Sequence, residues 1–297
     1  MAKTRQHTGP KLACEITPER VIAARITDDG YGLDSFTARS LAAGTVVPRM
    51  SDTNIANGEG VRQAVSDALT TVGAKSQDIV AILPDACVRI ALLDFDTLPD
   101  KKQEADGVIR FRLKKSLPFD VDQAILSYDV VRKDGKVQVI AAIVESGVLA
   151  EYEGLFRDLG YVPGVVLPST LASLGNVSGT DPVLVIKADG STTTLAIVAN
   201  NELMLFRTLE NQGNTLPTFE QLAQDVHASL VFFQDTYGMS VGRILVGGLI
   251  DADSVSATLE AQTGVRVENL VSSQYAGSNR PNLPVSFLAG VVGALLG

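Results

Sequence analysis

A short polar turn between two apolar runs is the first place in this sequence where chemistry can be expected. The turn, residues 187–191, contains Asp189, Gly190 and Ser191, and Val, Ile and Thr dominate the runs on both sides. Such residues suit tight turns, and backbone N–H and hydroxyl groups in turns of this kind bind anions. Two interpretations therefore stay open: an ordinary core hairpin and a loop that binds phosphate groups.

A similar opening occurs near the N-terminus. The run 12–16 is followed by Thr17 and Pro18, and a second apolar run, 20–26, comes next. Glu15 supplies a carboxylate here, whereas Pro18 has no N–H to offer. Because the two openings are similar, we expect the chain to contain two copies of one structural plan.

Two neighbouring glycines in the second half are a third candidate. Gly247 and Gly248 follow an apolar run that ends at position 246. Glycines let the backbone approach a ligand closely, but they also end strands for packing reasons alone, so both interpretations stay open. The sequence shows no cluster with metal-ligand spacing and no Ser-His-Asp arrangement, so we predict neither a metal site nor a triad hydrolase.

Composition sets the class of protein. The chain has 297 residues, of which 45% are hydrophobic and 20% charged, and this profile is typical of a globular protein with two lobes of moderate size. The net charge of −9 argues against nucleic acid as a partner, because phosphate backbones need clustered Lys and Arg. No run reaches the length of a membrane span.

The candidate residues need a scaffold, and the order of elements predicts one. Hairpins, an amphipathic helix and a buried strand follow each other in both halves of the chain. We predict a first lobe from residues 11–86 and 168–180 and a second lobe from residues 181–297. Residues 87–167 have a β-α-β-β-α-β pattern and are expected to form an α+β subdomain inserted into the first lobe.

This plan resembles the actin-like ATPase superfamily, and six stretches resemble PilM-like type IV pilus assembly proteins in particular. The similar stretches are residues 82–99, 114–120, 125–131, 219–234, 244–270 and 286–296, so the resemblance covers nearly the whole chain from Leu12 onward. It implies an α/β, two-lobed actin-like fold with an inserted subdomain. FtsA and the cytoplasmic part of type II secretion L proteins share this plan and are the near alternatives.

The resemblance also implies a nucleotide site between the lobes, but the chain departs from the family there. By position, the site comprises Glu15, Thr17, Lys187, Asp189, Gly190, Ser191, Gly247 and Gly248. The family has Asp-x-Gly in both loops, whereas this chain has Glu15 and Thr17 in the first and Lys187 in the second. We expect Lys187 to pair with Glu15 across the cleft and to replace the metal.

The connection that carries the family's lid subdomain is also short here. Only residues 208–217 separate the third strand of the second lobe from the next helix, so we expect a reduced lid. A missing lid leaves the nucleotide open to water, and water weakens electrostatic contacts. The sequence therefore predicts a pseudo-ATPase that does not bind ATP and Mg²⁺ productively. A working actin-like ATPase is the alternative.

For PilM-like proteins, the resemblance implies a cytoplasmic scaffold that is peripheral to the inner membrane. Its expected partner is the N-terminal tail of the inner-membrane protein PilN, and other pilus subunits and a second copy of the chain are further candidates. The resemblance places the tail between the first lobe and the insert, near Arg112, Pro118 and Phe119. The simpler interpretation is that Pro118 and Phe119 end a helix and pack beneath it.

Overall fold

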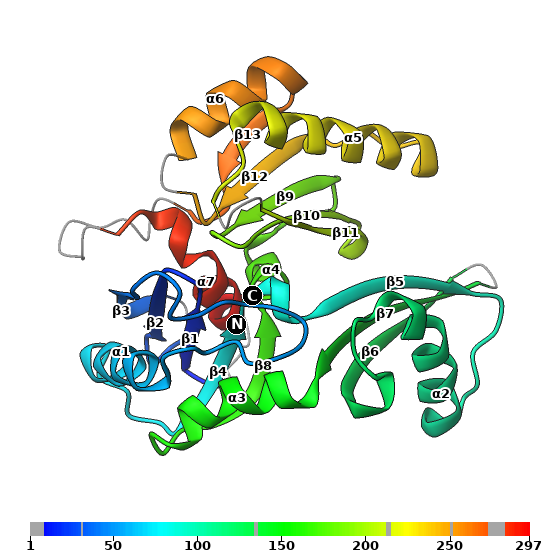
Figure 1. Cartoon of the computed structure of the whole chain (residues 1–297). Helices are drawn as coiled ribbons and strands as arrows, with labels where there is room; N and C mark the ends of the chain where they lie inside the picture. Colours follow the sequence, from blue (N-terminus) through cyan, green and yellow to red (C-terminus); the bar gives the residue numbers. More distant parts are fainter. Residues whose placement is uncertain (1–8, 31, 134–135, 212–214, 250–251, 273–282) are drawn as a thin grey trace, which may run out of the picture.

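The computed structural model describes residues 9–30, 32–133, 136–211, 215–249, 252–272 and 283–297. Two sheets form the centres of two lobes, and a third, smaller sheet extends from the first lobe (Figure 1). No helix in this described part of the chain has both the length and the hydropathy of a membrane span.

The first lobe is built on a five-stranded sheet with the strand order β3-β2-β1-β4-β8. The first three strands form an antiparallel meander, and β4 and β8 add to it in parallel. The bounds are β1 (Leu12–Ile16), β2 (Arg20–Ile26), β3 (Leu33–Ser40), β4 (Asp78–Leu83) and β8 (Val162–Pro168). The whole of β1 and nearly all of β4 are buried, which agrees with their continuous apolar sequences.

The second lobe repeats this plan. Its sheet has the order β11-β10-β9-β12-β13, again with three antiparallel strands followed by two parallel ones. The bounds are β9 (Val183–Ala188), β10 (Thr192–Ala199), β11 (Glu202–Glu210), β12 (Arg243–Gly247) and β13 (Arg266–Asn269). The turn between β10 and β11 has positive φ at Asn200 and Asn201, as a tight hairpin requires. The expected duplication of one plan is confirmed.

Helices cover the outer face of each sheet. In the first lobe these are α1 (Gly58–Thr71) and α3 (Ser146–Arg157), and in the second α5 (Phe219–Tyr237) and α6 (Ala252–Thr263). A capping box between Thr218 and Gln221 begins α5, and left-handed Gly238 ends it. Only residues 211–218 connect β11 to α5, a length that leaves no room for a full lid subdomain.

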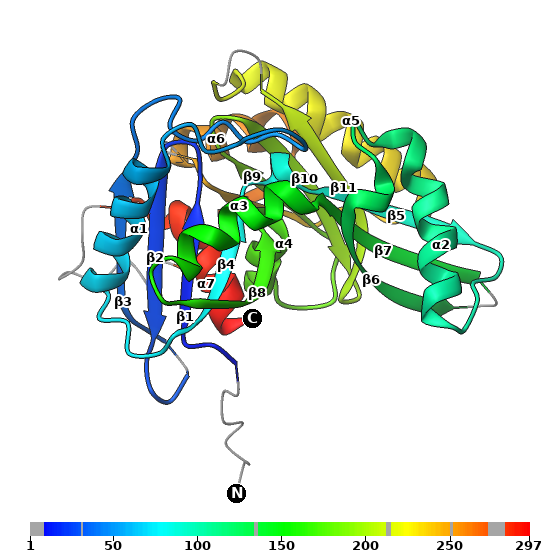
Figure 2. The ribbon, with the colours of Figure 1, turned by 60° about the horizontal axis from the view of Figure 1, so that its bottom comes forward.

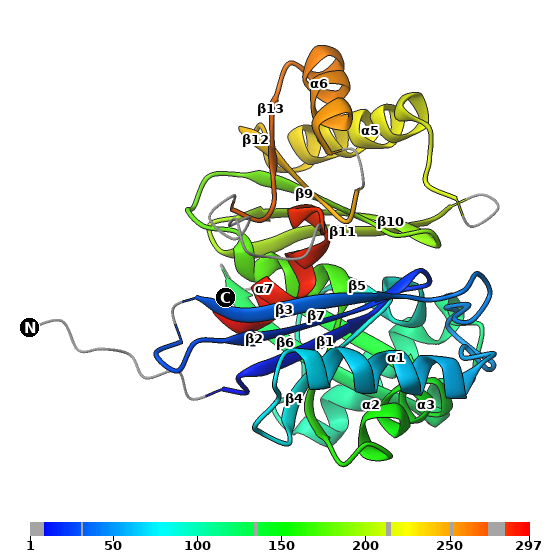
Figure 3. The same cartoon turned by 90° about the vertical axis from the view of Figure 1, so that its left-hand side faces the viewer.

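The last helix, α7 (Ala289–Leu296), lies between the lobes (Figure 3). It packs on β1, β2 and the short helix α4 (Ser169–Ser173), all of which belong with the first lobe. Our expectation assigned this segment to the second lobe. The contact is close, because a Cβ on Gly293 would come within 2.2 Å of the Ala172 carbonyl oxygen. With Phe287 and Leu288, α7 fills the core between the two sheets.

The insert is smaller than the sequence suggested. Its own sheet has the order β5-β7-β6, with α2 packed on it (Figure 2). The bounds are β5 (Arg89–Phe95), α2 (Lys102–Leu113), β6 (Ala124–Lys133) and β7 (Lys136–Glu145). The predicted range 87–167 also included α3 and β8. However, β8 pairs with β4, and α3 packs in the first-lobe core with α1, because partners distant in sequence outweigh neighbours in the chain.

Candidate functional site

A buried ion pair joins the two lobes at the bottom of the cleft. Lys187 Nζ on β9 lies 3.0 Å from Glu15 Oε1 on β1, and the two side chains are 5% and 0% exposed. Ser169 donates a hydrogen bond to the same oxygen at 2.5 Å. Strand register fixes both positions, since Glu15 pairs with Ile22 and Lys187 pairs with Gly247. The expected pairing of Lys187 with Glu15 is confirmed.

Lys187 lies among three carboxylates. Burial by itself would lower the pKa of Lys187, but attraction by Glu15, Asp189 and Asp85 outweighs burial and raises the pKa above its ordinary value. The ammonium group therefore stays charged although it is buried. A fixed positive charge at the bottom of the cleft repels a divalent cation such as Mg²⁺.

Asp85 is a functional candidate that the sequence analysis missed. It follows β4 directly, and it accepts hydrogen bonds from the Thr170 backbone N–H and from the Thr194 hydroxyl, both at 2.9 Å, as well as from the Thr170 hydroxyl. Burial raises the pKa of Asp85, while the bonds from Thr170 and the charge of Lys187 act in the opposite direction. Its position after a buried strand, at the carboxyl edge of a sheet, was the available signal.

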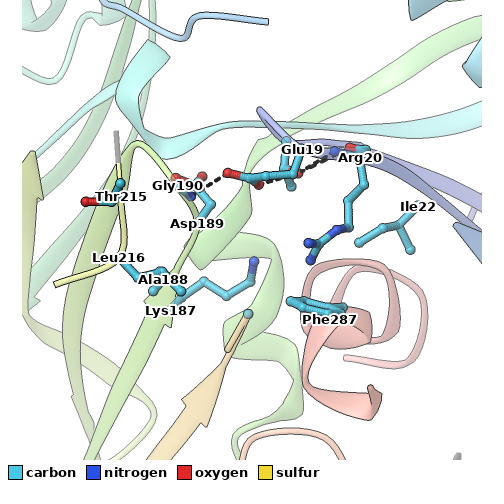
Figure 4. Close-up of a pocket in the computed structure, with 12 residues that line it drawn as sticks. Glu19, Arg20, Ile22, Lys187, Ala188, Asp189, Gly190, Thr215, Leu216 and Phe287 are labelled. Atoms are coloured by element: carbon cyan, nitrogen blue, oxygen red, sulfur yellow. Dashed lines mark hydrogen bonds between the residues drawn. The ribbon is translucent and has the colours of Figure 1, made fainter. Parts of the chain in front are cut away.

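The turn for which phosphate binding was one of two interpretations is occupied by the chain's own carboxylates. Asp189 Oδ1 accepts hydrogen bonds from the N–H groups of Ser191 and Thr192, both at 2.8 Å. Gly190 N–H donates to Glu19 Oε1 of the opposite lobe, also at 2.8 Å (Figure 4). An incoming phosphate would have to displace a carboxylate at each of these three N–H groups.

Glu19, the second residue that the sequence analysis missed, is held by the first hairpin turn. Thr17 donates its hydroxyl to Glu19 Oε2 at 3.2 Å, so this predicted nucleotide residue positions a carboxylate instead. The next residue, Arg20, stacks on Phe287 with its guanidinium carbon 3.7 Å from the ring centroid (Figure 4). An acid beside Pro18 in a hairpin was the only signal for Glu19 in the sequence.

A cavity remains between the lobes above the ion pair. Its volume is about 290 Å³, just below the range of about 300–1,000 Å³ that is usual for sites of drug-sized ligands. Its lining includes Thr17, Glu19, Arg20, Ile22, Lys187, Ala188, Asp189, Gly190, Thr215, Leu216, Gly248 and Phe287. Three charged residues of this lining, Glu19, Lys187 and Asp189, are already hydrogen-bonded or ion-paired within the protein.

The glycine pair serves packing. Gly248 has φ +78, and a Cβ there would lie 2.0 Å from the Ala188 carbonyl oxygen. Its N–H donates to the Ser286 carbonyl at 2.8 Å, which joins β12 to the segment before α7. A Cβ on Gly247 would lie 3.1 Å from the Ala289 side chain. Both glycines thus allow neighbouring backbone and side chains to approach closely. This agrees with the interpretation that the glycine pair serves packing.

The three residues predicted to contact the partner lie apart from this cleft, in the insert. Arg112 and Pro118 are exposed at and beyond the end of α2. Phe119 is half-buried and packs against the core formed by α2 and the sheet of the insert, as the simpler interpretation proposed. Their role in partner binding stays a prediction.

Comparison with known proteins reveals the fold. No protein-family model matches the chain, and no curated protein matches it in sequence. Among solved structures, a chain of the PilM–PilN type IV pilus biogenesis complex superposes with a TM-score of 0.80. The match covers 97% of this chain and 98% of that chain at 18% identity. The chain has a PilM-like, actin-like ATPase fold.

Two further structures share this PilM-like fold more loosely. The ethanolamine utilization protein EutJ from Carboxydothermus hydrogenoformans gives a TM-score of 0.53 at 10% identity, covering 98% of this chain and 91% of that one. The cytoplasmic domain of EpsL, an inner-membrane component of the type II secretion system of Vibrio cholerae, gives 0.51 at 10% identity, with coverages of 89% and 98%. The fold predicted from the sequence is confirmed.

Proposed function

We propose that this chain is a PilM-like scaffold of a type IV pilus assembly machine. It binds the N-terminal tail of an inner-membrane PilN protein and is thereby held on the cytoplasmic face of that membrane. The observation that carries the proposal is the superposition on a chain of the PilM–PilN complex over nearly the full length of both chains. The type II secretion alternative has weaker support, since the EpsL domain matches at a TM-score of 0.51.

We further propose that the cleft has lost productive nucleotide binding. Three features support this: a lysine in the metal position, carboxylates bonded to the N–H groups of the phosphate turn, and a small cavity. A working ATPase would need the Glu15–Lys187 pair to break, which leaves two uncompensated buried charges. These contacts between the lobes fit a role in which the cleft fixes the lobes relative to each other.

For the partner tail we propose an extended conformation at the boundary of the first lobe and the insert. The strands β8 and β6 are the outer strands of their sheets on one side, and outer strands add a further strand readily. Both expose apolar side chains, with Val162 52%, Val165 40% and Ile125 49% exposed. Backbone pairing along such an edge would give affinity, and pockets for alternate side chains would give specificity.

Calorimetry with a synthetic peptide of the PilN tail from the same genome tests this function. We expect one peptide to bind per chain, and Val165→Asp to weaken binding. Val231→Asp on α5 is the matched control, because Val231 is 42% exposed and lies in the other lobe. Absence of binding to the unmodified chain would contradict the scaffold function. Unchanged affinity after Arg112→Glu and Phe119→Ala would remove those two residues from the site.

A further inference from the structure

The outward face of α2 carries an aromatic side chain that the fold does not use. Phe111 is 81% exposed, more than any other large hydrophobic residue for which exposure is described, and Val108 one turn before it is 37% exposed. The opposite face of the same helix buries Ala105, Ile109 and Leu113 in the core of the insert. The helix thus has one apolar face that packs and a second apolar site that does not.

Basic residues surround this aromatic side chain. Residues 107–116 contain Arg110, Arg112, Lys114 and Lys115 and no acidic residue, so this segment has a charge of +4. Since the whole chain has a charge of −9, the rest has −9 − 4 = −13. The segment is therefore a basic region on an otherwise strongly acidic protein.

Three of these four cations are available at the surface. Arg110 is directed inward and donates to the carbonyl oxygens of Val121 and Ala124. Arg112, Lys114 and Lys115 are exposed, and no ion pair to a described residue is found for them. The nearest acid on the helix, Asp106, is half-buried and hydrogen-bonded with Tyr128 of β6. Glu104 is paired with Lys101 at 3.0 Å, while Asp120 and Asp122 lie beyond the helix end.

The shape of this region favours a flat partner. Figures 1 and 2 both show α2 at the outer edge of the insert, away from the two lobes. None of the three cavities described at the cleft and beside the second lobe is lined by a residue of α2. The helix protrudes, and its outward face has one aromatic residue with cations around it. Such a face suits a flat anionic surface better than it suits an extended peptide.

We propose that this face, formed by Val108, Phe111, Arg112, Lys114 and Lys115, binds the surface of an anionic lipid membrane. Phe111 enters the boundary between headgroups and acyl chains, and the three cations contact lipid phosphates. This goes beyond the scaffold function, because it needs no protein partner. If the tail of a membrane protein is also bound, the lipid contact is a second attachment to the same membrane. It raises the effective concentration of the chain near the tail.

Vesicle flotation tests the proposal directly. The purified chain is mixed with phosphatidylcholine vesicles, with or without about 30% phosphatidylglycerol, in buffer of low ionic strength. We expect flotation only with the anionic vesicles and release at about 0.5 M salt, where the Debye length is a few ångströms. Lys114→Glu should lower the partition coefficient about thirtyfold, since a charge reversal removes the attraction of one cation and adds a repulsion of similar size. Phe111→Ser should weaken it by a similar factor.

Two matched variants control for general effects. Lys75→Glu reverses an exposed lysine in the first lobe, and Phe232→Ser removes a 53% exposed phenylalanine from α5, so neither should change flotation. Thermal unfolding of each variant checks that the fold is kept. The proposal is overturned if the unmodified chain does not float with anionic vesicles, floats equally with neutral ones, or keeps its flotation after Phe111→Ser and Lys114→Glu. Since the vesicles contain no protein, this result is independent of tail binding.

Discussion

Glu15 and Lys187 lie 172 residues apart in the sequence and form one ion pair that joins the two lobes. Each comes from a strand at the centre of its own sheet, and both side chains are almost fully buried. A charge in this position is tolerated only while its partner is present, because neither group can be solvated by water. The pair therefore fixes the distance between the central strands of the two lobes.

Removing either partner should destabilise the protein strongly. We expect Lys187→Met to lower the free energy of unfolding by about 3–5 kcal/mol, because Glu15 is left as an uncompensated buried charge. Urea denaturation followed by circular dichroism measures this change. The double variant Glu15→Gln/Lys187→Met leaves neither member of the pair without its partner and should recover most of the loss. A double variant as unstable as the sum of the single variants would show that the pair is not coupled.

Asp85 should make stability depend on pH with a definite sign. The pKa of Asp85 in the folded state is raised above its ordinary value of 3.8, so the folded state retains the proton over a window that begins at 3.8 and ends at the raised value. The stabilisation that Asp85 contributes is fully present at pH values below this window. It is lost as the pH rises through the window. The variant Asp85→Asn has no carboxyl group at this position, so its stability lacks this pH dependence.

Urea denaturation of both proteins, from about pH 4 to about pH 8, isolates the effect. The free energy of unfolding of the unmodified chain minus that of Asp85→Asn should fall as pH increases and then become constant. A difference that rises with pH would mean that hydrogen bonds from Thr170 and Thr194 outweigh burial. In that case the pKa of Asp85 would lie below its ordinary value.

Magnesium ATP at millimolar concentration should not raise the melting temperature, because the N–H groups of residues 190–192 are already bonded to Glu19 and Asp189. Glu19→Ala frees the N–H of Gly190, so inorganic phosphate should stabilise this variant more than the unmodified chain. Glu59→Ala is the matched control, because the Glu59 side chain on α1 is exposed. Clear stabilisation of the unmodified chain by magnesium ATP, or phosphate release that Asp189→Ala abolishes, would restore the ATPase hypothesis.

Gly248 should not tolerate a side chain, whereas Gly160 should tolerate one better. Both have positive φ, +78 and +83, but only at Gly248 would a Cβ meet another group, the Ala188 carbonyl oxygen. Gly160→Ala should therefore cost about 1–2 kcal/mol from backbone strain alone. Gly248→Ala adds a steric clash and should cost at least about 2 kcal/mol more. Equal melting temperatures of the two variants would contradict this account of the glycine pair.

Local signals explain which features the sequence could predict. The two hairpin openings are each contained in fewer than thirty consecutive residues, so the repeat of β1-β2 and β9-β10 was visible as a pattern. The Glu15–Lys187 pair was predictable from the family resemblance, which places the two residues on opposite sides of one cleft. A lysine in a position that requires an acid, opposite a remaining acid, has few ways to be buried other than as an ion pair.

Features that depend on distant partners were not predictable. Nothing near β8 indicates that it pairs with β4, and its position directly after α3 suggested a separate subdomain. Asp85 finds its partners 85 and 109 residues away, at Thr170 and Thr194. Glu19 reaches Gly190 across the cleft, 171 residues away. Such contacts follow from how the lobes face each other, which hydrophobic periodicity does not encode.

The position of α7 has a consequence for how the protein folds. Gly290 approaches the Glu15 carboxylate so closely that a Cβ there would lie 2.4 Å from Oε2, although the two residues are 290 − 15 = 275 positions apart. Contacts of such long sequence separation form late, since the entropy of closing the loop must be overcome first. During synthesis the inner face of the first-lobe sheet therefore stays uncovered until α7 packs on it. Chaperones can bind this apolar face during that time.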